Sequence, residues 1–286
     1  MPREHSSKHD DARRPAVTRN WLYVRLRPAP PSGGEAHGMT GMPALIDHLR
    51  SADPDGRWAF QRLIDHSGPH VGVWLYSRAE VLHELGVRAG RLAPEPHPAG
   101  PGQQTPLSAR YLGDRAARTA TDLSHLSSEF ALDLLAAGEL REGEQLGLAV
   151  AHLAHLAQLV PARNRAAFLF QCWQFRAAEL PGATRVALMT RARNEAGAVL
   201  ATVTAQAMQP GHRAVWERYL DGLARLVAVP GVLDAQAYVV FDHAHLTHNR
   251  LGIGSADEAL AAQVVRTALL DGLDLPGARI PELQPV

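Results

Sequence analysis

The chain has 286 residues, of which 46% are hydrophobic and 20% charged, and its 29 basic side chains equal its 29 acidic ones. This is the composition of a globular protein that can bury a sizeable core without disulfides or metals. The balanced charge disfavours nucleic acid as a partner, because phosphate binding usually needs a basic excess. No apolar run reaches the roughly 18 residues that cross a bilayer, and the lone Cys172 cannot form an internal disulfide. We therefore expect a cytoplasmic protein without a membrane span.

The N-terminal third is expected to hold a small sheet behind an unstructured end. Residues 1–19 are charged and aperiodic, which predicts a disordered tail, and residues 20–286 are expected to form a single domain. Three β-prone segments predict strands at residues 21–27, 57–65 and 70–76. The turn residues Ser67-Gly68-Pro69 predict that the last two strands form a hairpin.

The other elements are expected to be mostly helical. Pro43 suits the first turn of a helix near residues 44–51, and the Pro- and Gly-rich residues 90–108 predict a surface loop that serves as a lid or binding loop. Apolar spacing predicts helices at roughly 113–137, 143–160, 163–177, 211–228, 236–250 and 256–271. Residues 185–208 fit either a helix or paired strands. Strands followed by helices indicate an α+β fold, not alternating βαβ units.

Common cofactor and nucleophile motifs are missing from the sequence. It has no Gly-rich phosphate loop, no Gly-x-Ser-x-Gly elbow, no His-Glu-x-x-His pair and no dinucleotide fingerprint. His152 and His155 share a helix face, and His243, His245 and His248 cluster, but no carboxylate or cysteine follows at metal-ligand spacing. We expect neither a metal nor a cofactor.

Three segments carry a family resemblance over residues 20 to about 271. They are Trp58-Ala-Phe-Gln-Arg62 with Asp65 and Pro69-His70, Arg110-Tyr-Leu-Gly113 with Leu126-Ser-Ser-Glu129, and His245-Leu-Thr-His-Asn249-Arg250-Leu-Gly252. In this order they resemble the C-terminal elimination domain of lanthipeptide dehydratases and its relatives in thiopeptide pathways. The resemblance implies that a β-sheet-containing N-terminal part packs with a mostly helical C-terminal part.

Departures from the family pattern distinguish its subfamilies. Members that eliminate glutamate carry His-x-Arg-x-Arg, and paired arginines suit a glutamyl carboxylate. Here the segment is His70-Val-Gly72-Val-Trp74, and Leu107 stands where an acidic partner of Arg110 is expected. These changes make the chain similar to the stand-alone thiopeptide pyridine synthases. Those enzymes perform a formal aza-[4+2] cycloaddition between two dehydroalanines of a thiazole-containing precursor peptide, and release water and the leader peptide.

The resemblance implies a site and a partner. The partner is the modified precursor peptide with its leader, and a homodimer is compatible with the sequence. Tyr219 is expected to polarise the amide oxygen of the diene, and His245 to move the departing proton. The complete set of candidates is catalytic Ser127, Ser128, Tyr219 and His245, substrate-binding Trp74, Arg110, Tyr111, Trp173, Gln174 and Asn249, and leader-binding Arg91, Arg115 and Arg118.

Every candidate also has a structural alternative. His245 can be a core histidine, the serines can bond back to a helix carbonyl, and Asn249 can cap or bridge helices. The aromatic candidates can serve packing alone, and the arginines can hold a loop or be solvated surface charges. Two other functions also stay open, namely the glutamate-eliminating component of a split dehydratase and a non-catalytic escort that binds the leader.

Overall fold

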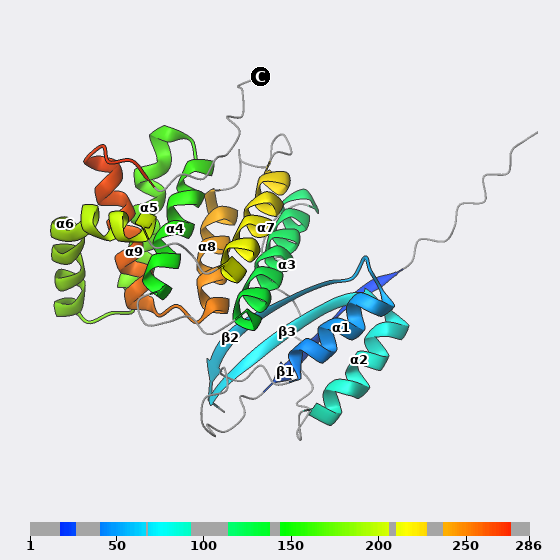
Figure 1. Ribbon diagram of the computed structural model, residues 1–286. Helices are drawn as coiled ribbons and strands as arrows, with labels where there is room; N and C mark the ends of the chain where they lie inside the picture. Colours follow the sequence, from blue (N-terminus) through cyan, green and yellow to red (C-terminus); the bar gives the residue numbers. More distant parts are fainter. Residues whose placement is uncertain are drawn as a thin grey trace, which may run out of the picture.

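The computed structural model describes residues 18–26, 41–66, 68–92, 114–137, 144–205, 210–227 and 237–275. Nearly all of the predicted tail lies outside these ranges, as do residues 93–108 of the predicted surface loop. In chain order the elements are β1 Arg19–Leu26, α1 Met42–Ala52, β2 Arg57–Asp65, β3 Gly68–Arg78, α2 Ala79–Leu92, α3 Asp114–Ala136, α4 Glu144–Leu159, the 3-10 turn η2 Ala162–Asn164, α5 Arg165–Ala177, α6 Gly182–Ala205, α7 Pro210–Val227, α8 Ala237–Leu251 and α9 Ser255–Leu270. Figure 1 shows the sheet and its helices beside a larger group of helices, which confirms the α+β prediction.

The three strands form an antiparallel sheet with the order β1-β3-β2, so the predicted hairpin of β2 and β3 is confirmed. Register places Tyr23 opposite Trp74 and Phe60 opposite Val73. Because side chains alternate along a strand, Phe60 and Val73 share one face, whereas Tyr23 and Trp74 lie on the other. The second face carries Gly72, which stands opposite Arg25.

Helices α1 and α2 pack beside the sheet (Figure 1). α2 was not predicted, and the assignment of residues 90–92 to a loop was wrong because they form its last turn. Val81, Leu82, Leu85 and Ala89 are its buried positions, and they follow the helical spacing of an amphipathic face. α2 starts at the residue after β3 ends, so no turn residues separate the two elements.

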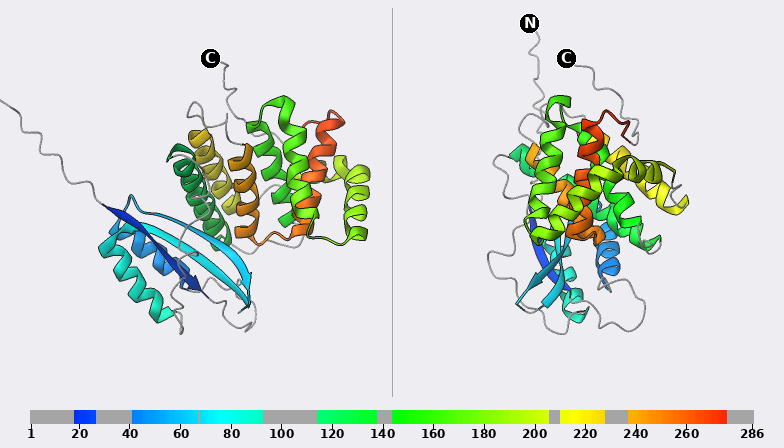
Figure 2. Two further views of the ribbon diagram at one scale, coloured as in Figure 1. Left: turned by 180° about the vertical axis from the view of Figure 1, so that it is seen from behind. Right: turned by 90° about the vertical axis from the view of Figure 1, so that its left-hand side faces the viewer.

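Helix α9 is central to the larger helical part, where it contacts α4, α5 and α6 (Figures 1 and 2). The ambiguous residues 185–208 are helical as far as Ala205, and residues 206–208 lie outside the described ranges. Ala192, Ala196 and Leu200 are buried at four-residue spacing, which places one stripe of α6 against the core. None of the described helices is both long and apolar enough to span a membrane.

Helix α3 binds the open edge of the sheet. β2 is an edge strand, so half of its backbone groups need partners from outside the sheet. The backbone N–H of Phe60 donates to Oγ of Ser128 at 3.2 Å. One turn earlier, Nδ1 of His125 lies 3.4 Å from N and 3.2 Å from O of Trp58. The indole of Trp58 donates to Glu129 at 2.6 Å, so α3 is fixed along this edge.

Helix α8 binds the same edge further along. Asn249 accepts a hydrogen bond from the N–H of Arg62 and donates one to its carbonyl, each at 2.9 Å. Nε of Arg250 donates to the carbonyl of Phe60 at 2.7 Å. Gly252 follows the last residue of α8. Its φ of 75° is costly for other residues, and the turn returns hydrogen bonds to the last carbonyls of the helix. The edge of the sheet thus ends on side chains of two helices.

Candidate functional site

Ser127 and Ser128 lie side by side on α3 and are both buried. The hydroxyl of Ser128 donates to the carbonyl of Ser124 at 2.7 Å while it accepts from the sheet edge. Ser127 accepts a hydrogen bond from Nη1 of Arg250 and lies 3.4 Å from the same Ser124 carbonyl. Ser128 therefore joins helix to sheet, and Ser127 faces the guanidinium.

Arg250 is an interior cation with unused hydrogen-bonding capacity. The residue is 1% exposed, and burial lowers the pKa of its guanidinium to about 9, so it remains charged at neutral pH. Within the described ranges, Nη2 has no hydrogen-bond partner and no carboxylate forms an ion pair with Arg250. A buried donor without an acceptor costs about 1–3 kcal/mol, so this cation is suited to an oxygen atom supplied from elsewhere.

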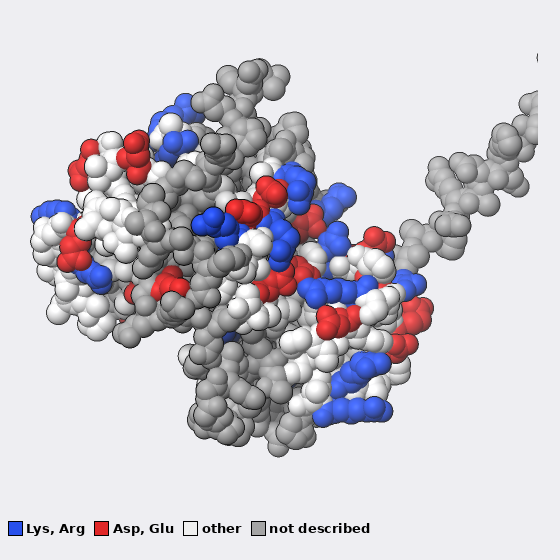
Figure 3. All heavy atoms as spheres, viewed as in Figure 1, with Lys and Arg blue, Asp and Glu red and all other residues white. Residues whose placement is uncertain are grey.

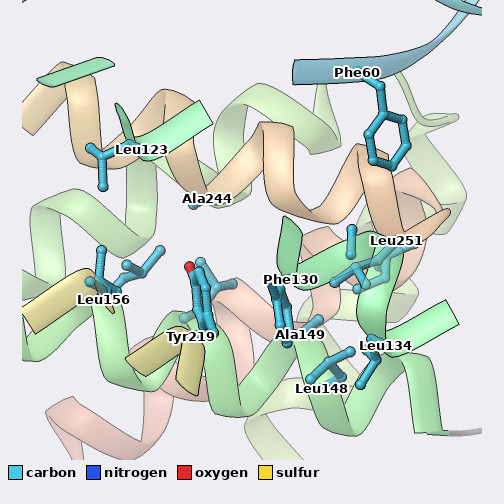
Figure 4. Packing of buried hydrophobic residues seen from close by; sticks show 14 of the residues in the cluster. Phe60, Leu123, Phe130, Leu134, Leu148, Ala149, Leu156, Tyr219, Ala244 and Leu251 are labelled. Atoms are coloured by element: carbon cyan, nitrogen blue, oxygen red, sulfur yellow. The ribbon is translucent and has the colours of Figure 1, made fainter. Parts of the chain in front are cut away.

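Tyr219 of α7 lies in the same interior. Its ring stacks on that of Phe130 of α3 (Figure 4), and the two ring centroids lie 4.3 Å apart. Its hydroxyl lies 2.8 Å from Nε2 of His152 on α4 and 2.7 Å from Nε2 of His243 on α8. Burial raises the pKa of the phenol, so the hydroxyl is protonated at neutral pH.

The hydrogen-bonded row continues beyond His152. Its Nδ1 lies 3.0 Å from Nε2 of His248, whose Nδ1 lies 3.3 Å from Oε1 of Glu258 on α9. Burial, reinforced by the neighbouring histidines, holds the pKa of His152 well below its usual value. Burial alone would raise the pKa of Glu258, but His248 and His245 outweigh it and hold that pKa well below the usual range. Glu258 is therefore an interior carboxylate.

His245 occupies the outer end of this row. Its Nδ1 lies 2.5 Å from Nη2 of Arg176 and 3.6 Å from Oε2 of Glu258. Nε of Arg176 donates to the same Oε2 at 2.6 Å. The ring centroid of Phe175 lies 5.2 Å from that of His245, and the side chain of His245 is 22% exposed. Of the predicted catalytic residues, His245 alone reaches the surface in part, and the row separates it from Tyr219.

Trp74 lies away from this row, in the sheet. It is 7% exposed, and its ring centroid is 5.0 Å from that of Tyr23. A Cβ on Gly72 would lie 2.9 Å from Cε2 of Tyr23, so the tyrosine ring occupies the space that a side chain at position 72 would need. The sheet face that carries His70 thus has an aromatic pair beside a glycine.

The remaining candidates are dispersed. Trp173 is half-buried beside Phe170 on α5, and Gln174 is exposed on the same helix. Asn249 bridges α8 to the sheet. Arg91 and Arg118 are exposed on α2 and α3. Arg110, Tyr111 and the side chain of Arg115 lie outside the described residues. Figure 3 shows cations and anions interspersed over the face that it presents.

Sequence reasoning did not find the residues that complete the row. His152, His243 and His248 belong to histidine clusters that were considered only as metal ligands, and Glu258, Arg176 and Arg250 were not candidates. Glu258 comes from a different helix, so spacing along the chain could not associate it with His248. No group of three or more His, Cys, Asp or Glu side chains that could hold a metal ion occurs in the described part of the chain.

Fold and site define a class of protein: an α+β domain in which α3 and α8 bind the open edge of a three-stranded sheet, and α4, α7 and α8 carry a buried tyrosine–histidine row. The chain belongs to the family of lantibiotic biosynthesis dehydratase C-terminal domains, whose family model matches residues 21–269. No curated protein matches the chain.

Solved structures are similar to this chain. The tRNA-dependent lantibiotic dehydratase MibB from Microbispora sp. 107891 aligns over 90% of this chain with a TM-score of 0.60 and 21% identity, and this chain covers 28% of its length. TsrL aligns over 89% of this chain and 95% of its own, with a TM-score of 0.50 and 12% identity. The pyridine synthase TbtD from thiomuracin biosynthesis aligns over 88% and 98%, with a TM-score of 0.49 and 18% identity.

Proposed function

We propose that this chain is a pyridine synthase of thiopeptide biosynthesis. One dehydroalanine of the precursor peptide reacts as a 2-azadiene, through the iminol tautomer of its amide, and a second dehydroalanine supplies the alkene. Ring closure gives a hydroxylated nitrogen heterocycle, which becomes a pyridine when water and the leader peptide, released as an amide, are lost. Holding two distant residues in reacting geometry can supply roughly 7–11 kcal/mol of the barrier.

The observation that carries this proposal is the filled space at Gly72. Glutamate-eliminating relatives are expected to have arginines at this position and at Trp74. Here the Tyr23 ring lies across Gly72 and packs on Trp74. A long cationic side chain at position 72 would displace that ring, so the sheet face favours flat aromatic groups over a glutamyl carboxylate.

Arg25 and Arg176 support the same reading, because acidic residues of the protein already bind them, whereas Arg250, which no described carboxylate binds, lies in the interior beside Ser127. Arg25, opposite Gly72, makes a bidentate pair with Asp65 at 2.8 and 2.9 Å. Arg176, beside His245, is bound by Glu258 at 2.6 Å. A substrate carboxylate would have to compete with these ion pairs, which disfavours the glutamate-eliminating alternative.

In the proposed reaction the hydroxyl of Tyr219 donates to the amide oxygen that becomes the iminol. Ser127 and Ser128, with Arg250 beside Ser127, supply further polar groups, and His245 moves the departing proton. Positioned proton donors and acceptors contribute about 10²–10⁴-fold to a rate. Tyr219 is 2% exposed, so turnover requires α7 to separate locally from α3 and α8 to admit the peptide.

Substrate and leader contacts complete the proposal. Trp74, Trp173, Gln174 and Asn249, with Arg110 and Tyr111, are proposed to bind the heterocyclic peptide core. Arg91, Arg115 and Arg118 are proposed to bind an acidic leader. If the leader is held by charge, its dissociation constant rises with ionic strength.

One assay separates the alternatives. The purified chain is mixed with a linear peptide that contains thiazoles, two dehydroalanines and its leader, and products are identified by mass. Cyclised product with free leader amide is expected. Activity only on glutamylated serine peptides would support glutamate elimination, and binding without mass change would support an escort; either result contradicts the proposal. Tyr219→Phe should lower the rate roughly 10²-fold, whereas Tyr76→Phe in the sheet should leave it unchanged.

A further inference from the structure

The row from Tyr219 to Glu258 can adopt few hydrogen-bonding patterns, because each member has few choices. Glu258 is ionised and accepts hydrogen bonds only. Nδ1 of His248 lies 3.3 Å from Oε1 of this carboxylate but is not aligned for a hydrogen bond with it. A lone pair on Nδ1 would face the negative charge at this distance, so Nδ1 is the nitrogen that carries the hydrogen. The groups that face Glu258 are Arg176 and Cys172 of α5 and His245 and His248 of α8.

The proton on His248 determines the next contacts when its ring is neutral. Its Nε2 then has a lone pair and accepts from Nδ1–H of His152 across 3.0 Å. Nε2 of His152 is consequently bare and accepts from the hydroxyl of Tyr219 across 2.8 Å. The tyrosine oxygen in turn accepts from Nε2–H of His243 across 2.7 Å. Every donor between Tyr219 and Glu258 thus points toward the carboxylate.

The opposite order is disfavoured in the resting protein. It would require a second proton on His248, in an interior that already holds Arg176 and Arg250. It would also add a buried N–H on Nδ1 of His243 to the one on Nδ1 of His248, and neither atom has a hydrogen-bond partner among the described residues. An unpaired buried N–H is rarer and costlier than an unpaired lone pair on a ring nitrogen.

We infer that Glu258 is a positioning residue that fixes the ring tautomers of His248 and His152, and through them the acceptor that the Tyr219 hydroxyl finds at Nε2 of His152. No covalent bond forms or breaks in this arrangement. The tautomers follow from geometry alone, whereas their effect on turnover rests on the proposed function.

Nitrogen-15 NMR of the histidine-labelled full chain without substrate tests the direction. Long-range ¹H–¹⁵N spectra distinguish protonated from bare ring nitrogens, and spectra of His152→Asn and His248→Asn assign the signals. At pH 8 we expect Nδ1–H on His152 and on His248. A proton on Nε2 of His152 in the unaltered chain would overturn the inference, and this measurement needs no destabilising variant.

Glu258→Gln tests the role of the carboxylate. Arg176 donates to Oε2, so the amide oxygen should keep that place and the amide N–H₂ should face His248. His248 must then carry its proton on Nε2, and His152 must follow, so both tautomers reverse. Glu179→Gln is the matched control, because Glu179 also binds Arg176 at 3.0 Å but is exposed. Unchanged tautomers in Glu258→Gln, or reversal in both variants, would overturn the role of Glu258.

Kinetics then separate this inference from the proposed function. Glu258→Gln should lower kcat of cyclisation roughly 10²-fold with little change in KM. If the unaltered chain does not cyclise the peptide, the proposed function fails while the NMR result stands by itself. If cyclisation proceeds with unchanged kcat in Glu258→Gln, the tautomers that Glu258 fixes are not used in turnover and the proposed function is unaffected.

Discussion

The side-chain amide of Asn249 satisfies both backbone groups of Arg62, accepting from its N–H and donating to its carbonyl at 2.9 Å each. The two residues are 187 positions apart in the chain. An amide carries both a donor and an acceptor, so it can replace the neighbouring strand that an edge residue lacks. This single side chain therefore extends the sheet into α8.

Asn249→Ala should lower the free energy of unfolding by about 2–3 kcal/mol, because two backbone groups lose their partners. Asn249→Asp keeps the acceptor and loses the donor, so an intermediate loss is expected. Urea denaturation measures both. Asn194→Ala, on the exposed face of α6, is the control and should change stability by less than about 0.5 kcal/mol. Equal stabilities for Asn249→Ala and Asn194→Ala would contradict this account of the edge.

Ser128→Ala should cost about 1–2 kcal/mol, since it removes the acceptor of the Phe60 N–H in the interior. Thr121 provides a matched hydroxyl on the same helix, because it donates only to the carbonyl of Ala117 within α3 at 2.8 Å. Thr121→Val should be nearly neutral, as that carbonyl keeps its helical hydrogen bond. The comparison by thermal unfolding is decisive: similar losses would mean that the serine does not hold the strand.

Gly72→Ala should destabilise the fold by about 1–3 kcal/mol, because its Cβ would meet the Tyr23 ring at 2.9 Å. Gly90→Ala in α2 meets no atom within 4 Å and should stabilise by about 0.4–1 kcal/mol through the unfolded state. Adding Tyr23→Ala to Gly72→Ala should show favourable coupling in a double-mutant cycle. Additive effects would indicate that the two residues do not compete for space.

His155 should make stability fall with acidity. It is buried, neither ring nitrogen has a hydrogen-bond partner among the described residues, and burial lowers its pKa from 6.5 to about 4. Above pH 6.5 the His155 ring is neutral in both the folded and the unfolded chain, so it does not change the free energy of unfolding. Between pH 6.5 and 4, His155 binds a proton in the unfolded chain but stays neutral in the folded chain. The unfolding free energy should therefore drop by about 1.4 kcal/mol per pH unit, on the order of 3 kcal/mol in all.

Urea titrations from pH 7.5 to 4.5 measure this slope. His155→Leu should remove its share of the pH dependence and leave that of the other buried histidines, such as His152 and His243. His83→Gln, on the exposed face of α2, should leave the slope unchanged. A slope that is the same in all three proteins would exclude His155 as its source.

Local patterns in the chain were enough for the strands, most helices and the family. The alternation of apolar and polar side chains at residues 21–27 and 57–65 indicates which side chains face a core. This pattern can be recognised from residues that are close together in the sequence. The third family segment also has a structural role, because its residues Asn249 and Arg250 both bind the open edge of the sheet. α2 was missed although its buried positions have helical spacing, because the segment 79–92 directly follows a strand without Gly or Pro to mark the boundary.

The chemistry of the interior depended on packing between distant segments. His152 and His248 are 96 positions apart, and Glu258 reaches His248 from a separate helix. Nothing in the spacing of these residues could reveal which nitrogen faces which oxygen, because that is set by how α4, α8 and α9 pack. Burial then gives each contact its effect, since a charge or a tautomer in a buried site is controlled by the few groups that touch it.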